Sequence, residues 1–197
     1  MSDKQKVDKT RRNLVVATSV VGGAACVGAA VPFITSMLPS ERAKAAGAPV
    51  EVDISQIGPG ELKVFEWRGK PVWVIRRTPD MLDSLKAVAG KLTDPASKSS
   101  LQPQFAANEH RSLKPEVMVM EGVCTHLGCS PQMKPADAKA EMGGDWAGGF
   151  YCACHGSKFD LAGRVFRGAP APTNLTVPPY AFLSDGTLLI GDDQKRA

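Results

Sequence analysis

Short runs of β-branched and aromatic residues, separated by glycine, proline and other turn residues, recur from position 50 to the C-terminus. Such runs are typical of strands, so we predict a mainly β domain. The expected strands are Val50–Ile54, Leu62–Trp67, Val72–Ile75, Glu116–Val123, Gly148–Ala153 and Asn174–Val177, followed by a hairpin that turns at Asp185-Gly186.

One segment of this domain has the period of a helix instead. Thr78 can cap its start, Pro79 suits the first helical position, and apolar residues then share a face at positions 81, 82, 85, 88 and 92. We therefore expect one helix inserted into the β domain. The polar stretch Asp94–Pro115, which contains His110, is expected to be a surface loop.

The N-terminal part has a different pattern, because no charged residue occurs between Arg12 and Glu41. About 20 apolar residues are enough to cross a bilayer, so we predict a transmembrane anchor over residues 13–38. A cleaved secretory signal and a buried core helix are the alternatives. The small residues of Ala43–Ala48 suit a cleavage site and keep the first alternative open.

A polar, alanine-rich segment bounded by Pro39 and Pro49 follows the anchor. We interpret residues 39–49 as a tether, helical or coil, to a domain that spans residues 50–197. Cys26, inside the anchor, is interpreted as a small apolar filler.

Composition and charge agree with this division. The chain has 197 residues, 43% hydrophobic and 22% charged, which gives room for one folded domain and an appendage. Five basic and two acidic residues within positions 1–12 contribute +3 of the formal net charge of +4, so no basic face for nucleic acid is indicated. The same basic residues predict a cytoplasmic N-terminus. Arg11 and Arg12 also resemble a twin-arginine export signal, which would imply a prokaryotic source.

The candidate chemistry lies in two clusters where expected strands run into loops. The first, "VCTHLGCSP", contains Cys124, His126 and Cys129; the second, "YCACHGSKFD", contains Cys152, Cys154 and His155. One thiolate and one imidazole from each loop would make a four-ligand site. A structural zinc site needs only four such ligands and leaves one cysteine per loop over. Disulfides alone would leave both histidines unused. Pairing the spare cysteines would join the two loops.

On these residues the chain resembles the Rieske iron-sulfur protein of the ubiquinol to cytochrome c reductase (cytochrome bc) complex, in its proteobacterial form. The resemblance covers the anchor, the tether, the β domain, the cluster-binding loops 123–131 and 151–160 with their boxes "CTHLGC" and "CACHGS", and a proline loop "GAPAP" at residues 168–172. It implies an antiparallel β-sandwich head with a small cluster-binding subdomain.

The resemblance also implies the cofactor and its ligands. Cys124 and Cys152 would hold one iron of a 2Fe-2S cluster, and His126 and His155 the other. Replacing two thiolates by neutral imidazoles removes negative charge from the cluster and eases reduction. Rieske centres accordingly span about −150 to +300 mV, against about −400 mV for all-cysteine plant-type ferredoxins.

Other positions are assigned by the same resemblance. Cys129 and Cys154 would form a disulfide that clamps the two loops, and the Ser157 hydroxyl would donate to a bridging sulfide. Leu127 and the proline loop would cover the cluster. Phe159 stands where many members have a tyrosine that hydrogen-bonds a ligand sulfur, so the reduction potential is expected to be lower than in those members.

The function implied is electron transfer within a multisubunit enzyme that contributes to the proton-motive force. His155 would contact ubiquinol and accept an electron and a proton at a site formed with cytochrome b, and the electron would pass to a cytochrome c-type subunit. The complex is expected to be dimeric, in a bacterial inner membrane, with a single-pass anchor and a periplasmic head.

Two redox alternatives share parts of this pattern. A soluble Rieske ferredoxin would carry the same boxes, and cleavage after Ala48 would favour it. A Rieske oxygenase needs a further iron site with two histidines and a carboxylate; with two of the three histidines used, only His110 remains, which excludes that enzyme. A zinc-stabilised extracytoplasmic binding module is the non-redox alternative.

Overall fold

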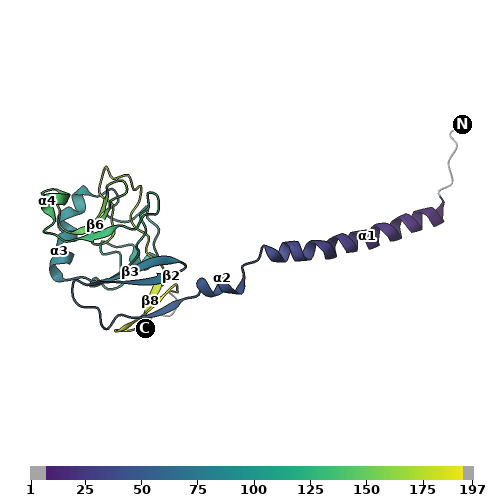
Figure 1. Cartoon of the computed structure of the whole chain (residues 1–197), viewed down its shortest axis with the longest axis horizontal. Helices are drawn as coiled ribbons and strands as arrows, with labels where there is room; N and C mark the ends of the chain where they lie inside the picture. The colour runs from purple at the N-terminus through teal and green to yellow at the C-terminus, as the bar shows by residue number, and fades with distance from the viewer. Residues whose placement is uncertain (1–7, 193–197) are drawn as a thin grey trace. The chain divides into compact units, whose positions relative to one another are not determined.

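The computed structural model describes residues 8–192 and divides the chain into two compact units, residues 1–45 and 46–197 (Figure 1). The first seven residues of the expected basic N-terminus, with Lys4 and Lys6, lie outside the described residues. The side chains of Arg42 and Ala46 are outside the description as well.

The first unit contains the long helix α1 (Lys9–Ser36). Asp8 caps its start, because the carboxylate accepts hydrogen bonds from the amides of Thr10 (2.9 Å) and Arg11 (3.2 Å). The helix continues through Pro32, and with 28 residues and an 18-residue stretch of mean hydropathy 2.1 it is long and apolar enough to cross a membrane. It begins four residues before the expected anchor because Asp8 supplies a cap at that point.

The expected tether contains one short helix, α2 (Glu41–Ala46), with an ion pair of 2.7 Å between Glu41 and Lys44. The division between the two units falls within this helix.

Over its described residues, 46–192, the second unit is built on three antiparallel three-stranded sheets, which confirms the mainly β fold. The first sheet has the order β1 (Val50–Asp53), β9 (Thr187–Ile190), β8 (Tyr180–Ser184); the second β2 (Leu62–Trp67), β3 (Lys70–Arg76), β4 (Val117–Glu121); and the third β5 (Gln132–Lys134), β6 (Gly149–Cys152), β7 (Ser157–Phe159).

Strands β3 and β4 of the middle sheet are buried on both faces, and their apolar residues are accordingly consecutive rather than alternating, whereas the edge strand β2 is largely exposed. Val72 and Val74 of β3 pack against the sheet formed by β1, β9 and β8. Trp73 and Ile75 point the other way, into a second apolar cluster with Phe150. Figure 1 shows this order of layers, with β6 above β3 and β8 below it.

The helical segments border this core. Helix α3 (Pro79–Val88) starts at the expected cap, where Thr78 Oγ1 accepts from the Met81 amide (3.4 Å). The remaining short segments are the 3-10 helices η1 (Ala89–Lys91) and η2 (Gln104–Ala106) and the helix α4 (Lys139–Met142).

Two expectations about secondary structure are wrong. Residues 174–177 form no strand, because their backbone groups bond to three separate segments: Leu175 to Gly163, Thr176 to Glu121 and Val177 to Leu101. Residues 94–115 are irregular as expected, but they are not a surface loop, since the Arg111 side chain within them is fully buried.

Candidate metal centre

The first cluster loop follows β4 and closes on itself. The Cys124 amide donates to the Cys129 carbonyl (2.7 Å), and the Gly128 amide donates to the Cys124 carbonyl (3.0 Å). Gly128 has φ +83°, a conformation that L side chains rarely adopt. The glycine therefore lets the "CTHLGC" box fold into a tight turn.

The second cluster loop is the tip of the hairpin between β6 and β7. Cys152 pairs with Ser157 at the end of the two strands, and the Gly156 amide donates to the Cys152 carbonyl (2.9 Å). Gly156, at φ +80°, allows the tight return. Gly149 at the start of β6 is also required, because a Cβ there would collide with the backbone of Phe159.

A disulfide between Cys129 and Cys154 joins the two loops, as the resemblance implied; the two Cα atoms are 6.8 Å apart. Cys124 and Cys152 are free and buried. The sulfur of Cys152 lies within 4.8 Å of both disulfide sulfurs. Because Cys129 and Cys154 are oxidised, Cys152 is the one member of that trio with a thiol that can bind metal.

The folded loops bring the sequence-predicted ligands together. The rings of His126 and His155 lie edge to face, with centroids 4.7 Å apart. The Cys124 thiol interacts with the Cys152 thiol and with the Ser157 hydroxyl. Burial raises the pKa of the Cys124 thiol, and the neighbouring Cys152 raises it further. A metal ion that replaces the thiol proton of Cys124 would pair with the resulting thiolate, so the negative charge would not be buried without a partner.

One ring nitrogen of His126 bears on whether these residues fit a metal centre. Its Nδ1 atom is buried and has no hydrogen-bond partner among the described residues. A buried ring nitrogen without a partner is costly unless something else occupies its lone pair or proton. Two buried thiols and an unpaired imidazole nitrogen form a donor set that suits Rieske ligation.

The two histidines differ in their access to solvent. His155 is exposed, whereas His126 is half-buried. Leu127, which directly follows His126 in the first loop, is 70% exposed despite its apolar side chain. Two loops that expose an imidazole and an apolar side chain are suited to contact with an amphipathic partner.

The expected proline loop, residues 168–172, is attached to both cluster loops. The Ala171 amide donates to Ser157 Oγ (3.0 Å), and Thr125 Oγ1 donates to the Thr173 carbonyl (2.7 Å). Sequence spacing gave no sign of the Thr125 contact, because a threonine between two ligands looks like any loop residue.

The remaining candidates lie at defined places. Phe159 is fully buried at the end of β7, in the same apolar cluster as Cys124 and Cys152. His110 lies away from the ligands, beside Glu109, with 3.2 Å between His110 Nε2 and the Glu109 carboxylate. Arg11 and Arg12 are the third and fourth residues of α1.

Comparison with known proteins adds family matches over most of the chain. Residues 50–180 match the model described as "Rieske [2Fe-2S] domain". Residues 1–40 match the model described as "Ubiquitinol-cytochrome C reductase Fe-S subunit TAT signal".

Three curated relatives have the name "Ubiquinol-cytochrome c reductase iron-sulfur subunit". The protein from Allochromatium vinosum is 55% identical over 98% of this chain and 94% of its own. The protein from Blastochloris viridis is 42% identical over 97% of this chain and 98% of its own. The protein from Bradyrhizobium diazoefficiens is 43% identical over 92% of this chain and 94% of its own.

Proposed function

The chain belongs to the Rieske [2Fe-2S] domain family, and on that premise we propose that Cys124 and Cys152 hold one iron of its cluster and that His126 and His155 hold the other. It is the iron-sulfur subunit of a ubiquinol-cytochrome c reductase and acts in electron transfer. When bound, a cluster with such mixed ligation supplies a one-electron carrier of high potential.

The observation that carries this ligand assignment is the combination of an unpaired Nδ1 on His126 with two buried free cysteines of the cluster loops. No hydrogen bond within the described residues competes for that nitrogen. His110 also has an unpaired, buried Nδ1, but it lies in the segment 94–115, outside those loops. The disulfide between Cys129 and Cys154 holds the loops that contribute the four side chains, so little loop entropy is lost when the ligands converge.

His155 is proposed to receive the proton of ubiquinol. Only one of its ring nitrogens can bind metal, so the other remains free to gain or lose a proton at the surface. Its exposed position supports this role, and the half-buried His126 is less suited to it.

Leu127 and the proline loop are proposed to face cytochrome b, where ubiquinol binds. Leu127 follows His126, whose ring meets the ring of His155, and it exposes most of an apolar side chain that can pack against an apolar quinone pocket. The electron then passes to a cytochrome c-type subunit. One fixed position cannot serve both partners, so residues 39–49 are proposed to let the head change position between them.

The localisation is proposed from the N-terminal segment. Helix α1 would cross a bacterial inner membrane once, with the N-terminus in the cytoplasm and residues 50–197 in the periplasm. Arg11 and Arg12 would be the arginine pair of the export signal. A dimeric complex is proposed from the resemblance to the family.

A substitution of His155 tests the assignment. We expect His155→Gln, in the full-length chain in its membrane, to abolish the Rieske EPR signal and quinol-cytochrome c reductase activity. His110→Gln is the matched control, because His110 lies outside the site and should leave both readouts normal. A normal EPR signal in the His155 variant would contradict the ligand assignment.

A further inference from the structure

The turn after the second cluster loop, residues 160–164, is held by a buried ion pair. Asp160 Oδ1 accepts from the amides of Ala162 (2.9 Å) and Arg164 (2.8 Å), and Oδ2 accepts from Arg164 Nε (2.7 Å). Arg164 also donates to the carbonyls of Pro95 (3.2 Å) and Leu85 (2.8 Å). Because the buried charges are paired and their remaining donors are used, this turn has one well-defined shape.

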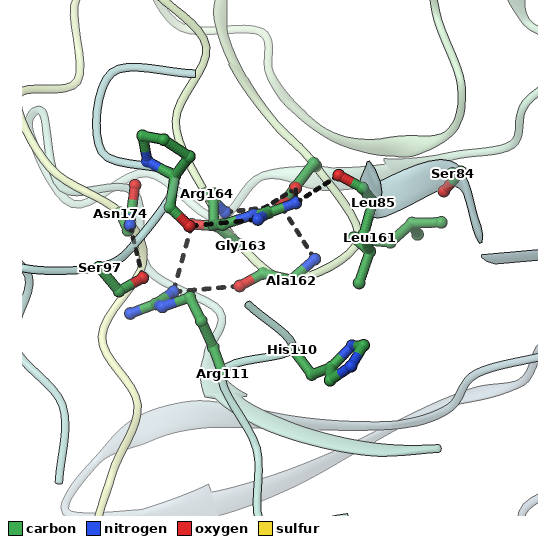
Figure 2. A network of polar contacts seen from close by, with 12 residues as sticks. Ser84, Leu85, Ser97, His110, Arg111, Leu161, Ala162, Gly163, Arg164 and Asn174 are labelled. Atoms are coloured by element: carbon green, nitrogen blue, oxygen red, sulfur yellow. Dashed lines mark hydrogen bonds and ion pairs between the residues drawn. The ribbon is translucent and has the colours of Figure 1, made fainter. Parts of the chain in front are cut away.

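A second arginine approaches the same turn from the irregular segment 94–115. Arg111 is fully buried, and its guanidinium donates to the carbonyls of Ala162 (3.1 Å) and Leu175 (2.7 Å). Gln102 Oε1 accepts from the other side of the guanidinium, at 3.0 and 3.1 Å. Burial lowers the pKa of Arg111 to about 10, so the group is charged at neutral pH. Figure 2 shows Arg111 and Arg164 on two sides of Ala162.

These contacts close the base of the proline loop. The chain leaves the turn after Arg164 and returns at Leu175, whose amide donates to the Gly163 carbonyl (2.8 Å). Asn174 Oδ1 accepts from the Val165 amide (2.9 Å). Arg111 adds the charged bridge across the same two chain segments, through Ala162 on one and Leu175 on the other.

Residues near the tip of the proline loop contact the two cluster loops, so the position of its base affects them. The Ala171 amide donates to Ser157 Oγ, so the hydroxyl proton of Ser157 points away from Ala171. The Cys124 thiol lies beside this hydroxyl. Thr125, next to His126, donates to the Thr173 carbonyl. A shift of the loop base would therefore move Ser157 and Thr125 relative to the cysteine and histidine ligands.

We propose that Arg111 is a positioning residue for the cluster, which fixes the base of the proline loop and, through Ala171 and Thr173, holds Ser157 and Thr125 in place. This inference rests on the proposed function. A lysine in place of Arg111 keeps the positive charge but has a single ammonium group, which cannot bridge Ala162, Leu175 and Gln102 in the planar geometry of a guanidinium.

The test uses Arg111→Lys in the full-length chain, purified in detergent with its complex. We expect a lower reduction potential, because the Ser157 hydroxyl loses its orientation, and a broadened EPR signal. We also expect amide hydrogen exchange about tenfold faster in residues 169–175. Arg77→Lys is the matched control. Arg77 is also buried, and burial lowers its pKa to about 10, but its guanidinium donates to Pro115, His110, Ser112 and Leu161 and not to residues 165–175. We expect the control to keep the reduction potential and the EPR line shape of the wild type, whatever its stability.

Gln102→Ala is the milder second variant, because Gln102 is partly exposed and only supports Arg111. If Arg111→Lys does not assemble, Gln102→Ala serves as the test instead. We expect it to change the potential, the EPR line shape and the hydrogen exchange in the same direction but by less. Wild-type potential, line shape and exchange in a folded Arg111→Lys protein, or in Gln102→Ala where that variant decides, overturn the positioning role. Absence of a Rieske EPR signal in the wild type overturns the proposed function instead, so the two failures are distinguishable.

Discussion

Phe159 is the residue at which this chain departs from the many family members with tyrosine. Its ring is fully buried in the apolar cluster that contains Cys124 and Cys152. A phenol hydroxyl there could donate to a ligand sulfur, and such a bond stabilises the reduced state more than the oxidised state. Because the ring is buried in this cluster, substituting tyrosine adds only one oxygen atom there, and the effect of that atom on the reduction potential can be measured.

We expect Phe159→Tyr to raise the midpoint potential by about 40 mV, since ~1 kcal/mol of differential stabilisation corresponds to that shift for one electron. A redox titration followed by EPR measures it. Phe150→Tyr is the control, because Phe150 pairs with Phe159 across β6 and β7 and stacks on Trp73 with ring centroids 4.9 Å apart. An unchanged potential in a fully loaded Phe159→Tyr protein would mean that the ring only fills space.

His110 provides a pH-dependent contribution to stability. Burial lowers its pKa, Glu109 opposes this effect, and the cationic Arg77, Lys86 and Arg164 add to it. The unfolded chain, with a histidine pKa of about 6.5, therefore binds more protons than the folded chain as the pH falls through that value. Stability is unaffected at higher pH and decreases below about 6.5.

We expect His110→Gln to reduce the loss of thermal stability between pH 8 and pH 5.5. The measurement is the Tm of the full-length protein and of the variant in detergent at both pH values. Comparing the two proteins cancels the effect of the ligand histidines, which both contain. An equal decrease in Tm for both proteins would show that His110 does not contribute.

At the scale of elements, the disulfide joins two loops whose own backbone bonds close each turn separately. It therefore fixes the distance between the turns rather than their internal shape. A link that closes a loop of 25 residues is worth about 3.5 kcal/mol in the chain-entropy account. The ligands come from both turns, so this constraint acts directly on the metal centre.

Replacing Cys129 and Cys154 together by serine is expected to lower cluster occupancy and shift the potential, with the four ligands still present. Iron and sulfide content per chain and EPR amplitude measure the loss. Cys26→Ser is the control, since Cys26 is a free cysteine of α1 outside the cluster loops. Full occupancy with an unchanged potential in the double variant would contradict a clamping role.

The strands that sequence predicted best are those with apolar residues on both faces or at a clear hairpin, such as β3 and the β8–β9 pair. Strands β5 and β7 have three residues each, too few to establish a period. The burial of Arg111 could not be predicted, because its carbonyl partners lie 51 and 64 residues further along the chain. The two cluster loops could be predicted because the residue types of the ligands and their spacing lie within short stretches of sequence.

At the scale of the whole molecule, the family matches follow the same division as the sequence pattern, with one match over residues 1–40 and another over residues 50–180. The first match is described as an export signal, and it contains both Arg11 and Arg12. Export of a folded head would let the cluster be inserted before the chain crosses the membrane.

We expect the double variant Arg11→Lys, Arg12→Lys to keep residues 50–197 in the cytoplasm. The substitution preserves positive charge, so it separates the arginine pair from the general preference for basic residues on the cytoplasmic side. Accessibility of the head to protease added to spheroplasts measures the outcome. Equal accessibility in the wild type and the variant would contradict the export assignment.

The central claim is that two histidines and two cysteines hold one 2Fe-2S cluster. Pulsed EPR of the dithionite-reduced full-length protein, labelled with 15N at histidine, tests it most directly. The account predicts an average g value below that of all-cysteine clusters and strong couplings to two histidine nitrogens, one from His126 and one from His155. A colourless protein without this signal, or a cluster coupled to one histidine or none, would contradict it.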